Sequence, residues 1–320
     1  MTRELRVAAA QLGPVGCHDS RADVVERLIA LARQAADEGA QLIAFPELAL
    51  TTFFPRWWFD DQADIDAFFE TEMPGPDTSA LFDEARRLGV AFSLGFAELT
   101  SGSAPGEGGR PRHYNTTILV DPEGHEVARY RKIHLPGHEQ HEPWRPFQHL
   151  ERAYFDPGPD PFAVHAALGG RIGLATCNDR RWPETYRLLG LQDVEVILIG
   201  YNTPIHYAPD PGQDRLAGFH NHLVMAAGAY QNGAFVVGVA KGGLEEGVES
   251  LAESQIIGPS GETLAQARTD GDEVVVATCD LDWCAHYRHT LFDFARYRRP
   301  ELYGPICERP LAPDEPGRRT

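Results

Sequence analysis

The chain has 320 residues, with 42% apolar and 24% charged side chains, the balance of a water-soluble globular protein. Acidic residues outnumber basic ones by 47 to 29, for a formal charge of -18, and no lysine- and arginine-rich run offers the basic face that a nucleic-acid or anionic-membrane binder needs. No apolar run is long enough to span a membrane, and the five cysteines form no Cys-x-x-Cys pair typical of structural zinc sites. We therefore expect a cytoplasmic protein with reduced thiols and with no nucleic-acid or membrane partner.

The N-terminal region predicts a strand, a helix and a second strand. The first strand is Leu5–Leu12. The helix begins at Asp19 or Ser20, either of which can cap it, and ends near Glu38. Leu42–Phe45 is then a short, fully apolar strand. Such a unit indicates neighbouring parallel strands joined by a right-handed crossover.

The rest of the chain alternates in the same way. Further helices are predicted at Ser79–Leu88, Arg215–Gln231 and, as a short helix, near Asp282 to Phe294. Further strands are predicted at Val90–Leu99, Tyr114–Val120, His125–Tyr130, Ile172–Ala175, Val194–Ile199, Phe235–Ala240, Ser254–Ile257 and Glu273–Asp280. Two segments lack a regular pattern: the aromatic-rich 51–58, which is typical of a pocket lining, and 133–160, which is long enough to suggest a functional loop.

These elements predict an α/β protein with more apolar strands than one ordinary sheet uses. A turn at 121–124 joins two strands into a hairpin, so the sheets should be mixed. We expect two such sheets packed face to face with helices outside. No linker divides the chain and no internal repeat has a fixed period. We predict a single domain over residues 1–303 and a tail, 304–320, that wraps a neighbour or stays mobile.

One cysteine stands where a strand meets a helix. Ile172–Ala175 is the apolar strand, Cys177 follows it, and Pro183 with Glu184 predicts the first turn of a helix. The backbone N–H groups at such a junction lower a thiol pKa and favour the nucleophilic thiolate. The alternative is a buried structural cysteine, since free cysteines are often buried.

A cysteine nucleophile needs a base and a group that stabilises the developing oxyanion. Glu47 follows the strand Leu42–Phe45, and Lys132 stands at the end of a hairpin strand. Cys177 also lies at the carboxyl end of a strand, where sites form in open α/β sheets. The three groups can meet if their strands are neighbours. Taken singly, Glu47 as a helix cap and Lys132 as a surface lysine are the more common situations.

Three motifs change this balance, and they occur in the order in which the nitrilase superfamily of carbon–nitrogen hydrolases has them. They are Phe45-Pro-Glu-Leu, Arg129-Tyr-Arg-Lys-Ile-His-Leu and Cys177-Asn-Asp-Arg-Arg-Trp-Pro-Glu. Longer strings resemble the N-carbamoyl-D-amino acid amidohydrolase branch, and the resemblance extends to about Tyr303. These strings are the segments 46–57, 130–138, 145–151 and 200–204. The resemblance implies a four-layer α-β-β-α sandwich.

The resemblance also implies roles for individual residues. Cys177 is then the nucleophile, Glu47 the general base, and Lys132 the oxyanion donor, helped by the backbone N–H that follows Cys177. Glu151 matches a second glutamate that orients the site. A carboxylate, a lysine and a thiol in one pocket titrate as a coupled set. No metal and no organic cofactor is expected.

A carbamoyl amino acid carries a free carboxylate, and the residues after the nucleophile suit it. Arg180 and Arg181 can recognise a carboxylate in bidentate fashion, and Asn178 lies beside them. Asn202 and Thr203 follow the next strand and can add hydrogen bonds. The alternative for the two arginines is an ion pair with Glu184 or Asp179. Arg181 also fits the wider superfamily pattern, which favours a structural role.

The histidines allow several interpretations. His134, His149 and His220 match positions that support the pocket through hydrogen bonds in the carbamoylase branch, although each can equally be a satisfied structural histidine. His138-Glu-Gln-His141 is one residue short of the His-Glu-x-x-His spacing of zinc enzymes, so we expect no metal site there.

The predicted activity is hydrolysis of an N-carbamoyl-D-amino acid through a carbamoyl-cysteine intermediate. The D configuration comes from the resemblance alone. Other amidases, a nitrilase, a β-ureidopropionase-like or a carbamoylputrescine-like hydrolase are the alternatives within the superfamily. A metallohydrolase that uses the histidine-rich segment is the mechanistic alternative, and a catalytically silent binding protein is the alternative from another class. As in other nitrilase-like proteins, we expect a homodimer or homotetramer.

Overall fold

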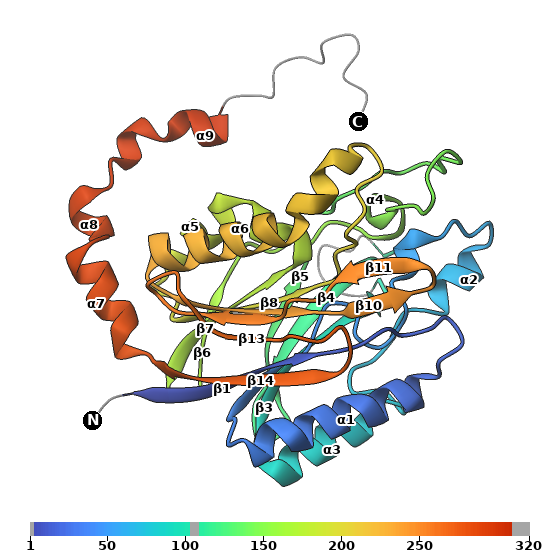
Figure 1. Ribbon diagram of the computed structural model, residues 1–320, viewed down its shortest axis with the longest axis horizontal. Helices are drawn as coiled ribbons and strands as arrows, with labels where there is room; N and C mark the ends of the chain where they lie inside the picture. The colour runs from blue at the N-terminus through green and yellow to red at the C-terminus, as the bar shows by residue number, and fades with distance from the viewer. Residues whose placement is uncertain (1–2, 103–108, 309–320) are drawn as a thin grey trace.

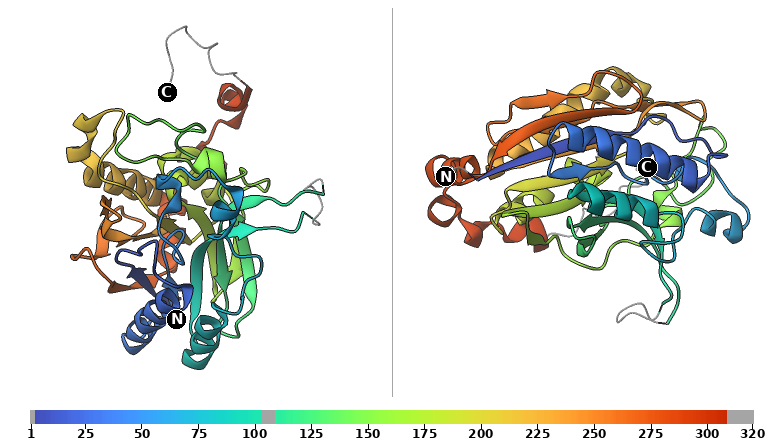
Figure 2. Two further views of the ribbon diagram at one scale, coloured as in Figure 1. Left: turned by 90° about the vertical axis from the view of Figure 1, so that its right-hand side faces the viewer. Right: turned by 90° about the horizontal axis from the view of Figure 1, so that it is seen from below.

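Two six-stranded mixed sheets pack face to face, and helices cover both outer faces (Figures 1 and 2). The computed structural model describes residues 3–102 and 109–308. The layers run helix, sheet, sheet, helix, which confirms the predicted four-layer sandwich. One apolar core fills the space between the sheets and continues under the helices of the second sheet, and another lies between the first sheet and its helices.

The first sheet is covered by α1 (Arg21–Asp37) and α3 (Ser79–Leu88). Its strands β1, β2 and β3 are parallel, and the others pair antiparallel. In spatial order the strands are β14 (Glu273–Asp280), β1 (Glu4–Gln11), β2 (Leu42–Ala44), β3 (Ala91–Leu99), β4 (His113–Val120) and β5 (Glu126–Arg131).

The second sheet has the same pattern of directions, with β7, β8 and β9 parallel and the flanking strands antiparallel. Helices α5 (Pro183–Gly190) and α6 (Ala217–Asn232) cover it. In spatial order the strands are β13 (Thr263–Gln266), β12 (Gln255–Ile257), β9 (Phe235–Ala240), β8 (Val196–Tyr201), β7 (Gly170–Thr176) and β6 (Val164–Ala167). The two halves thus share an architecture that no sequence period reveals.

Shorter elements complete the described chain. Three-residue to six-residue 3-10 helices are η1 (Phe54–Arg56), η2 (Cys177–Arg181), η3 (Pro211–Leu216) and η4 (Pro300–Leu302). Short α-helices are α2 (Gln62–Asp66), α4 (Glu151–Tyr154), α7 (Asp282–Thr290), α8 (Phe294–Tyr297) and α9 (Gly304–Glu308). A separate hairpin consists of β10 (Gly242–Glu245) and β11 (Val248–Leu251).

Strand β1 has apolar residues at successive positions rather than at every second position, because both of its faces are covered. Val7 and Ala9 belong to the core between the sheets, whereas Ala8 and Ala10 pack under the helices of the first sheet. A strand with both faces covered reads as a continuous apolar run. The helix that follows is capped by Ser20, whose side chain accepts a hydrogen bond from the Asp23 backbone N–H at 3.1 Å.

Some connections are not visible in the local sequence pattern. Strand β12 pairs with β13, and β14 crosses to the first sheet beside β1. The segment between β9 and β12 contains the β10–β11 hairpin. The helix predicted near Asp282 to Phe294 is α7, which ends at Thr290. Local patterns identified strands but not their partners, because pairing depends on contacts between distant segments.

None of the helices in the described ranges has the length and apolar character needed to cross a membrane. The division into a domain of 1–303 and a tail remains a prediction.

Candidate active site

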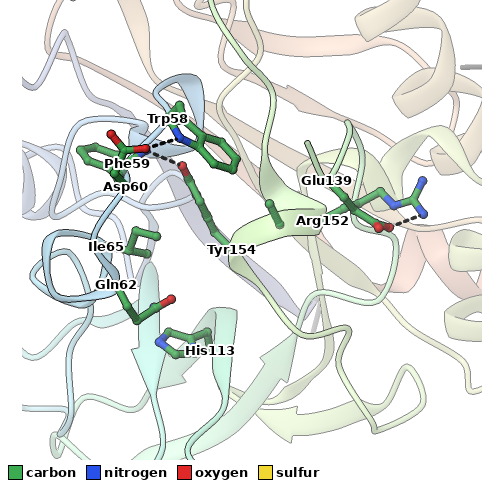
Figure 3. A pocket seen from close by; sticks show the side chains of 10 residues that line it. Trp58, Phe59, Asp60, Gln62, Ile65, His113, Glu139, Arg152 and Tyr154 are labelled. Carbon is green, nitrogen blue, oxygen red and sulfur yellow. Dashed lines mark hydrogen bonds and ion pairs between the residues drawn. The ribbon is translucent and has the colours of Figure 1, made fainter. Parts of the chain in front are cut away.

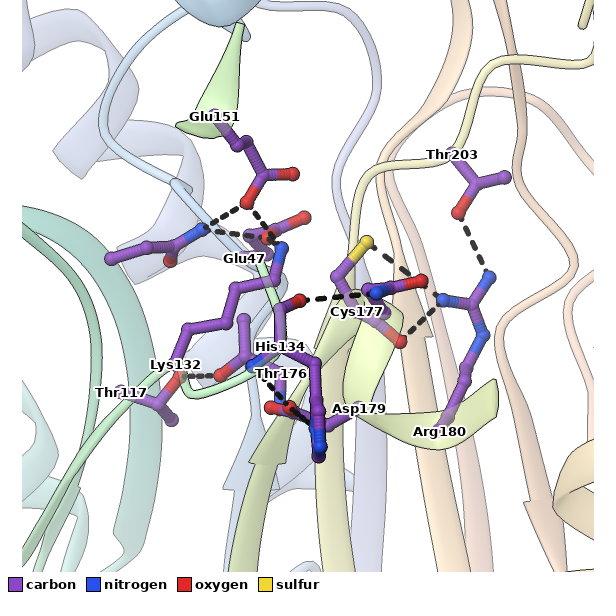
Figure 4. Close-up of polar contacts among 12 residues, drawn as sticks. Glu47, Thr117, Lys132, His134, Glu151, Thr176, Cys177, Asp179, Arg180 and Thr203 are labelled. Atoms are coloured by element: carbon purple, nitrogen blue, oxygen red, sulfur yellow. Dashed lines mark hydrogen bonds and ion pairs between the residues drawn. The ribbon is translucent and has the colours of Figure 1, made fainter. Parts of the chain in front are cut away.

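The reactive groups predicted from the sequence lie together between the carboxyl ends of strands from both sheets (Figure 4). Glu47 follows β2 and Lys132 follows β5 of the first sheet, while Cys177 follows β7 of the second sheet. These strands are not all neighbours within one sheet: β2 and β5 belong to the first sheet and β7 to the second. The groups meet instead because the two sheets pack face to face.

Lys132 bridges two buried carboxylates. Its Nζ lies 2.7 Å from Glu47 Oε1 and 2.5 Å from Glu151 Oε2, and all three side chains are fully buried. Asn115, on β4, donates from Nδ2 to Glu47 Oε1 at 2.8 Å and to Glu151 Oε2 at 3.4 Å. His149 contacts the other oxygen of Glu151 at 3.3 Å. The cluster is therefore fixed on several sides, and Glu47 Oε2 is left without a hydrogen-bond partner.

The two carboxylates differ in proton affinity. Burial raises the pKa of Glu47, Glu151 adds to this increase, and Lys132 opposes it. Burial alone would also raise the pKa of Glu151, but Lys132 and the His149 hydrogen bond outweigh it and lower that pKa. The pKa of Lys132 is raised despite burial, because Cys177, Glu151 and Glu47 surround the ammonium. Of the two carboxyl groups, Glu47 therefore holds a proton more readily than Glu151 does.

Cys177 is the first residue after β7 and has an unusual backbone. Its φ of 46° lies in the left-handed region, which costs a residue other than glycine about 1–3 kcal/mol. The expected lowering of the thiol pKa is wrong. Burial raises the pKa of Cys177, Glu47 raises it further, and Lys132 with Arg180 opposes the rise. The resting group is therefore a thiol, and attack requires a base.

Asp179 holds this strained turn in place. Its Oδ2 accepts the Thr176 backbone N–H at 2.9 Å and the Tyr130 hydroxyl at 2.7 Å. Its Oδ1 lies 2.7 Å from Nδ1 of His134, which also stacks on Trp182. The segment that carries Lys132 is thereby tied to the turn that carries Cys177. His134 supports the site through Asp179 rather than by touching Cys177.

Arg180 is buried beside Cys177 and bonds only to neutral groups in the described part of the chain (Figure 4). It donates to Cys177 O at 2.6 Å, to Asn221 Oδ1 at 2.9 Å and to Thr203 Oγ1 at 2.8 Å. Its guanidinium also lies 4.4 Å from the centre of the Tyr201 ring. The alternative of an ion pair with Asp179 or Glu184 does not occur for Arg180.

The remaining predicted residues take different positions. Arg181 is exposed, with no hydrogen bond or ion pair inside the described ranges. Asn178 donates to His134 O at 3.1 Å, and Asn202 is buried next to Thr203. The structure does not bring His220 into the cluster: it is exposed on α6, and its ring lies beside Phe219. Among the described residues His220 makes no hydrogen bond to the cluster, so the predicted supporting contact is absent there.

Residues of α4 and of the segment 58–65 line a cavity of about 510 Å³ (Figure 3). Arg152 and Tyr154 line it, whereas Glu151 of the same short helix faces Lys132. Arg152 pairs with Glu139 at 2.7 Å, and Trp58 donates to Asp60 at 2.9 Å. None of the residues predicted to react lines this cavity.

One group of three potential metal ligands occurs in the described ranges. Ligand atoms of Glu47, Glu151 and Cys177 lie within 4.8 Å of one another. The Lys132 ammonium already bonds to both carboxylates, so it supplies the positive charge at this position. The histidine-rich segment 133–160 assembles no comparable group within residues 3–102 and 109–308.

The same constellation can be compared with known proteins. A family model described as Carbon-nitrogen hydrolase matches residues 6–289. The chain belongs to the carbon–nitrogen hydrolase family. It is similar to the N-carbamoylputrescine amidase of Solanum lycopersicum, with 30% identity over 94% of each chain. It is also similar to the citrullinase of Francisella tularensis, with 27% identity over 95% of this chain and 99% of the other.

The fold of this carbon–nitrogen hydrolase is shared with a solved structure. The carbon-nitrogen hydrolase from Helicobacter pylori G27 superposes with a TM-score of 0.80 and 20% identity, over 96% of this chain and 99% of that one. The protein is therefore a hydrolase of carbon–nitrogen bonds with the nitrilase-like fold, which confirms the superfamily expected from the three motifs.

Sequence reasoning missed several residues of the hydrolase site. Asn115 and Asp179 form hydrogen bonds with the predicted site residues or with the backbone beside them. Arg56 donates a hydrogen bond to Asn202. Asn115 is a polar residue in the apolar strand β4, which is a usable signal, since buried polar groups need partners. Asp179 stands inside the cysteine motif. Nothing local distinguishes Arg56 from an exposed loop arginine.

Two glycines allow the Glu47 turn to fit between the sheets. A Cβ on Gly95 of β3 would lie 2.6 Å from Pro46 O, and one on Gly200 of β8 would lie 2.5 Å from Glu47 N. These contacts are with backbone, which cannot rotate away. The position of Glu47 is thus set by one strand from each sheet.

We expect Gly200→Ala to lower kcat by about tenfold to a hundredfold, because the added methyl group shifts Glu47 relative to Cys177. KM should change little. Steady-state kinetics test this expectation. Gly271→Ala is the matched control, since a Cβ there meets no atom within 4 Å. Equal kinetics for both variants would show that the clamp on Glu47 is not important.

Proposed function

We propose that this protein hydrolyses N-carbamoyl-D-amino acids to a D-amino acid, carbon dioxide and ammonia. The observation that carries the proposal is the buried Arg180 guanidinium beside Cys177, whose described partners are all neutral. Buried charges in proteins are normally paired, because leaving water without a partner is costly. A substrate carboxylate supplies the missing negative charge. The exposed Arg181 next to it provides a second cation.

The proposed reaction begins with the Cys177 thiol. Glu47 takes its proton, and the sulfur attacks the ureido carbon. The carbon–nitrogen bond breaks, and the amino acid leaves with the proton held by Glu47. A carbamoyl thioester remains on Cys177. Glu47 then takes a proton from water, whose oxygen attacks the thioester, and the thiol is restored with release of carbamate. Carbamate decomposes to carbon dioxide and ammonia.

Lys132 is the proposed oxyanion donor. An ammonium has three N–H donors, and Glu47 and Glu151 accept two of them. The third N–H group can donate to the oxygen of the tetrahedral intermediate, together with the backbone N–H of Asn178. The carboxylates on either side keep Lys132 charged and fixed before substrate arrives.

The relatives name other carbamoyl substrates. N-carbamoylputrescine carries an amine that is positively charged at neutral pH, and Arg180 with Arg181 would repel it. Two arginines therefore favour the acid over the polyamine. The D configuration rests on the resemblance of the longer motif strings. The cytoplasmic location stays a prediction, and all five cysteines are free.

Ammonia release should be measured with D- and L-carbamoyl amino acids, N-carbamoylputrescine, β-carbamoyl-alanine and a simple amide. We expect the D-carbamoyl amino acids to give the highest kcat/KM. Arg181→Met should raise KM for them by about tenfold to a hundredfold, the value of one charged hydrogen bond, and should leave the simple amide within threefold. A wild-type enzyme that prefers N-carbamoylputrescine would refute the proposed substrate.

We also propose that two copies associate through the outer face of α5 and α6. Large apolar side chains are exposed on and beside these helices at Leu188, Leu191, Phe219, Leu223 and Tyr230. The arm formed by α8 and α9 exposes Tyr297, Leu302 and Ile306 near the end of the described chain. Light scattering should show a dimer or tetramer, and Leu223→Glu should shift it toward monomer. A monomeric wild type would contradict this assembly.

A further inference from the structure

A second buried ionic cluster, formed by Arg56, Lys241 and Glu245, lies next to the predicted substrate residue Asn202. Glu245, at the end of β10, accepts hydrogen bonds from Arg56 Nη1 at 3.3 Å and from Lys241 Nζ at 3.1 Å. The backbone N–H groups of Phe53 and Val15 also donate to it, at 2.7 and 3.0 Å. Two basic side chains thus share one carboxylate, and burial lowers the pKa of both.

Arg56 reaches from this cluster to the predicted substrate residue Asn202. Its Nη2 donates to Asn202 Oδ1 at 2.9 Å and to Ser250 Oγ at 3.0 Å. A guanidinium only donates hydrogen bonds, so the amide of Asn202 must turn its oxygen toward Arg56. Its Nδ2 is therefore fixed as the other end of the amide. That nitrogen is buried and has no acceptor among the described residues.

A buried amide N–H without an acceptor costs free energy, and this one belongs to a residue that a short chain of contacts joins to Cys177. Asn202 precedes Thr203, which bonds to Arg180, which in turn contacts Cys177. Burial lowers the pKa of Arg56, and the carboxylates of Glu245 and Glu47 oppose that shift. The free N–H donor of Asn202 suits an anionic group.

We propose that Arg56 is a positioning residue that sets the preference for a carboxylate: by holding Asn202 Oδ1, it presents Asn202 Nδ2 as a hydrogen-bond donor to the substrate. This inference rests on the proposed carbamoyl amino acid substrate. Arg56 itself does not touch the reacting atoms.

The backbone near Asn202 is held independently of Arg56. Leu251 N donates to Thr203 O at 2.8 Å, and Ile205 N donates to Glu249 O at 2.9 Å. Removing the guanidinium should therefore free the Asn202 side chain to rotate without displacing the strand end. Glu245 keeps Lys241 as its cationic partner in that variant.

The test compares an N-carbamoyl-D-amino acid with the N-carbamoyl amine that has the same side chain and no carboxylate. We expect Arg56→Met to raise KM for the acid by at least about tenfold and to leave the amine within threefold. Lys241→Met is the matched control, because it breaks the same cluster without touching Asn202. It should change kcat/KM for both substrates by the same factor.

Two further variants separate orientation from stability. Asn202→Asp keeps the side-chain shape but replaces the donor with an acceptor, so it should weaken binding of the acid by at least about a hundredfold and the amine far less. In the Arg56→Met background, Asn202→Ala should cost less for the acid than in wild type, because the amide is no longer oriented.

Two outcomes overturn the inference in different ways. If wild type does not prefer the acid over the amine, the proposed function fails and the inference fails with it. If wild type prefers the acid and Arg56→Met keeps that preference, or loses it only as much as Lys241→Met does, the inference alone fails.

Discussion

Cys177→Ala is expected to abolish turnover of every carbamoyl and amide substrate, by at least about 10⁴-fold, while the protein stays folded. The thiol is the group proposed to form the covalent intermediate, and no neighbouring side chain can replace it as nucleophile. Alanine removes one buried atom, the sulfur, and adds none, so the fold should tolerate the change.

The measurement is ammonia release at high enzyme concentration, together with a thermal unfolding midpoint. Wild-type enzyme quenched during turnover should also carry a carbamoyl group on the peptide that contains Cys177. Cys279→Ala is the control: that thiol is buried in the same core, and burial raises its pKa to about 12, so it should be unreactive. Appreciable turnover by Cys177→Ala would remove cysteine catalysis from the mechanism.

Lys132→Met is expected to impair both stability and catalysis. The variant leaves Glu47 and Glu151 buried without their shared cation, and removing one partner of a buried ion pair typically costs about 3–5 kcal/mol of unfolding free energy. Turnover should fall by at least about 10²–10³-fold, because the proposed oxyanion donor is lost. Denaturant unfolding and steady-state kinetics measure the two effects separately.

The loss of stability in Lys132→Met should depend on pH. Without the ammonium, burial raises the pKa of both carboxyl groups above their unfolded values of about 4.3. The folded state then binds more protons than the unfolded state, so stability rises as the pH falls toward that value. The difference from wild type should therefore be larger at pH 7 than at pH 5. A pH-independent difference would show that the carboxylates are not the cause.

A double variant tests the electrostatic reason. Lys132→Met combined with Glu151→Gln removes one cation and one anion, so it should recover part of the lost stability. It should recover no activity, because the oxyanion donor is still absent. If activity returned with stability, Lys132 would be a structural residue only.

The sequence predicted much of this site because its reactive residues follow recognisable strands. Glu47, Lys132 and Cys177 each stand at the end of an apolar segment, and the order of the three motifs matched a known superfamily. The inclusion of Glu151 in the site was predicted from the resemblance of segment 145–151 to a known branch of that superfamily. The observed cluster contains all four. Their catalytic roles remain proposals until the variants are measured.

Other features of the site could not be predicted locally. The Cys177 thiol has a raised pKa because burial and Glu47 outweigh Lys132 and Arg180, and that balance depends on distances across two sheets. Arg180 has only neutral partners in the described chain, although acidic residues flank it in the sequence. His220 matched a supporting position but is exposed on α6, beside Phe219. In each case the deciding partner comes from a distant segment.

The sequence by itself determined most of the longer strands and helices and the identity of the candidate reactive groups, because these depend on local periodicity and on residue chemistry. Only the tertiary structure decided which strands pair and which charges meet. The Glu47 turn is clamped by Gly95 and Gly200, and Asn202 is oriented by Arg56. Desolvation and hydrogen bonding act over a few ångströms in space. The packing of two sheets brings residues that are far apart in the chain to within such distances.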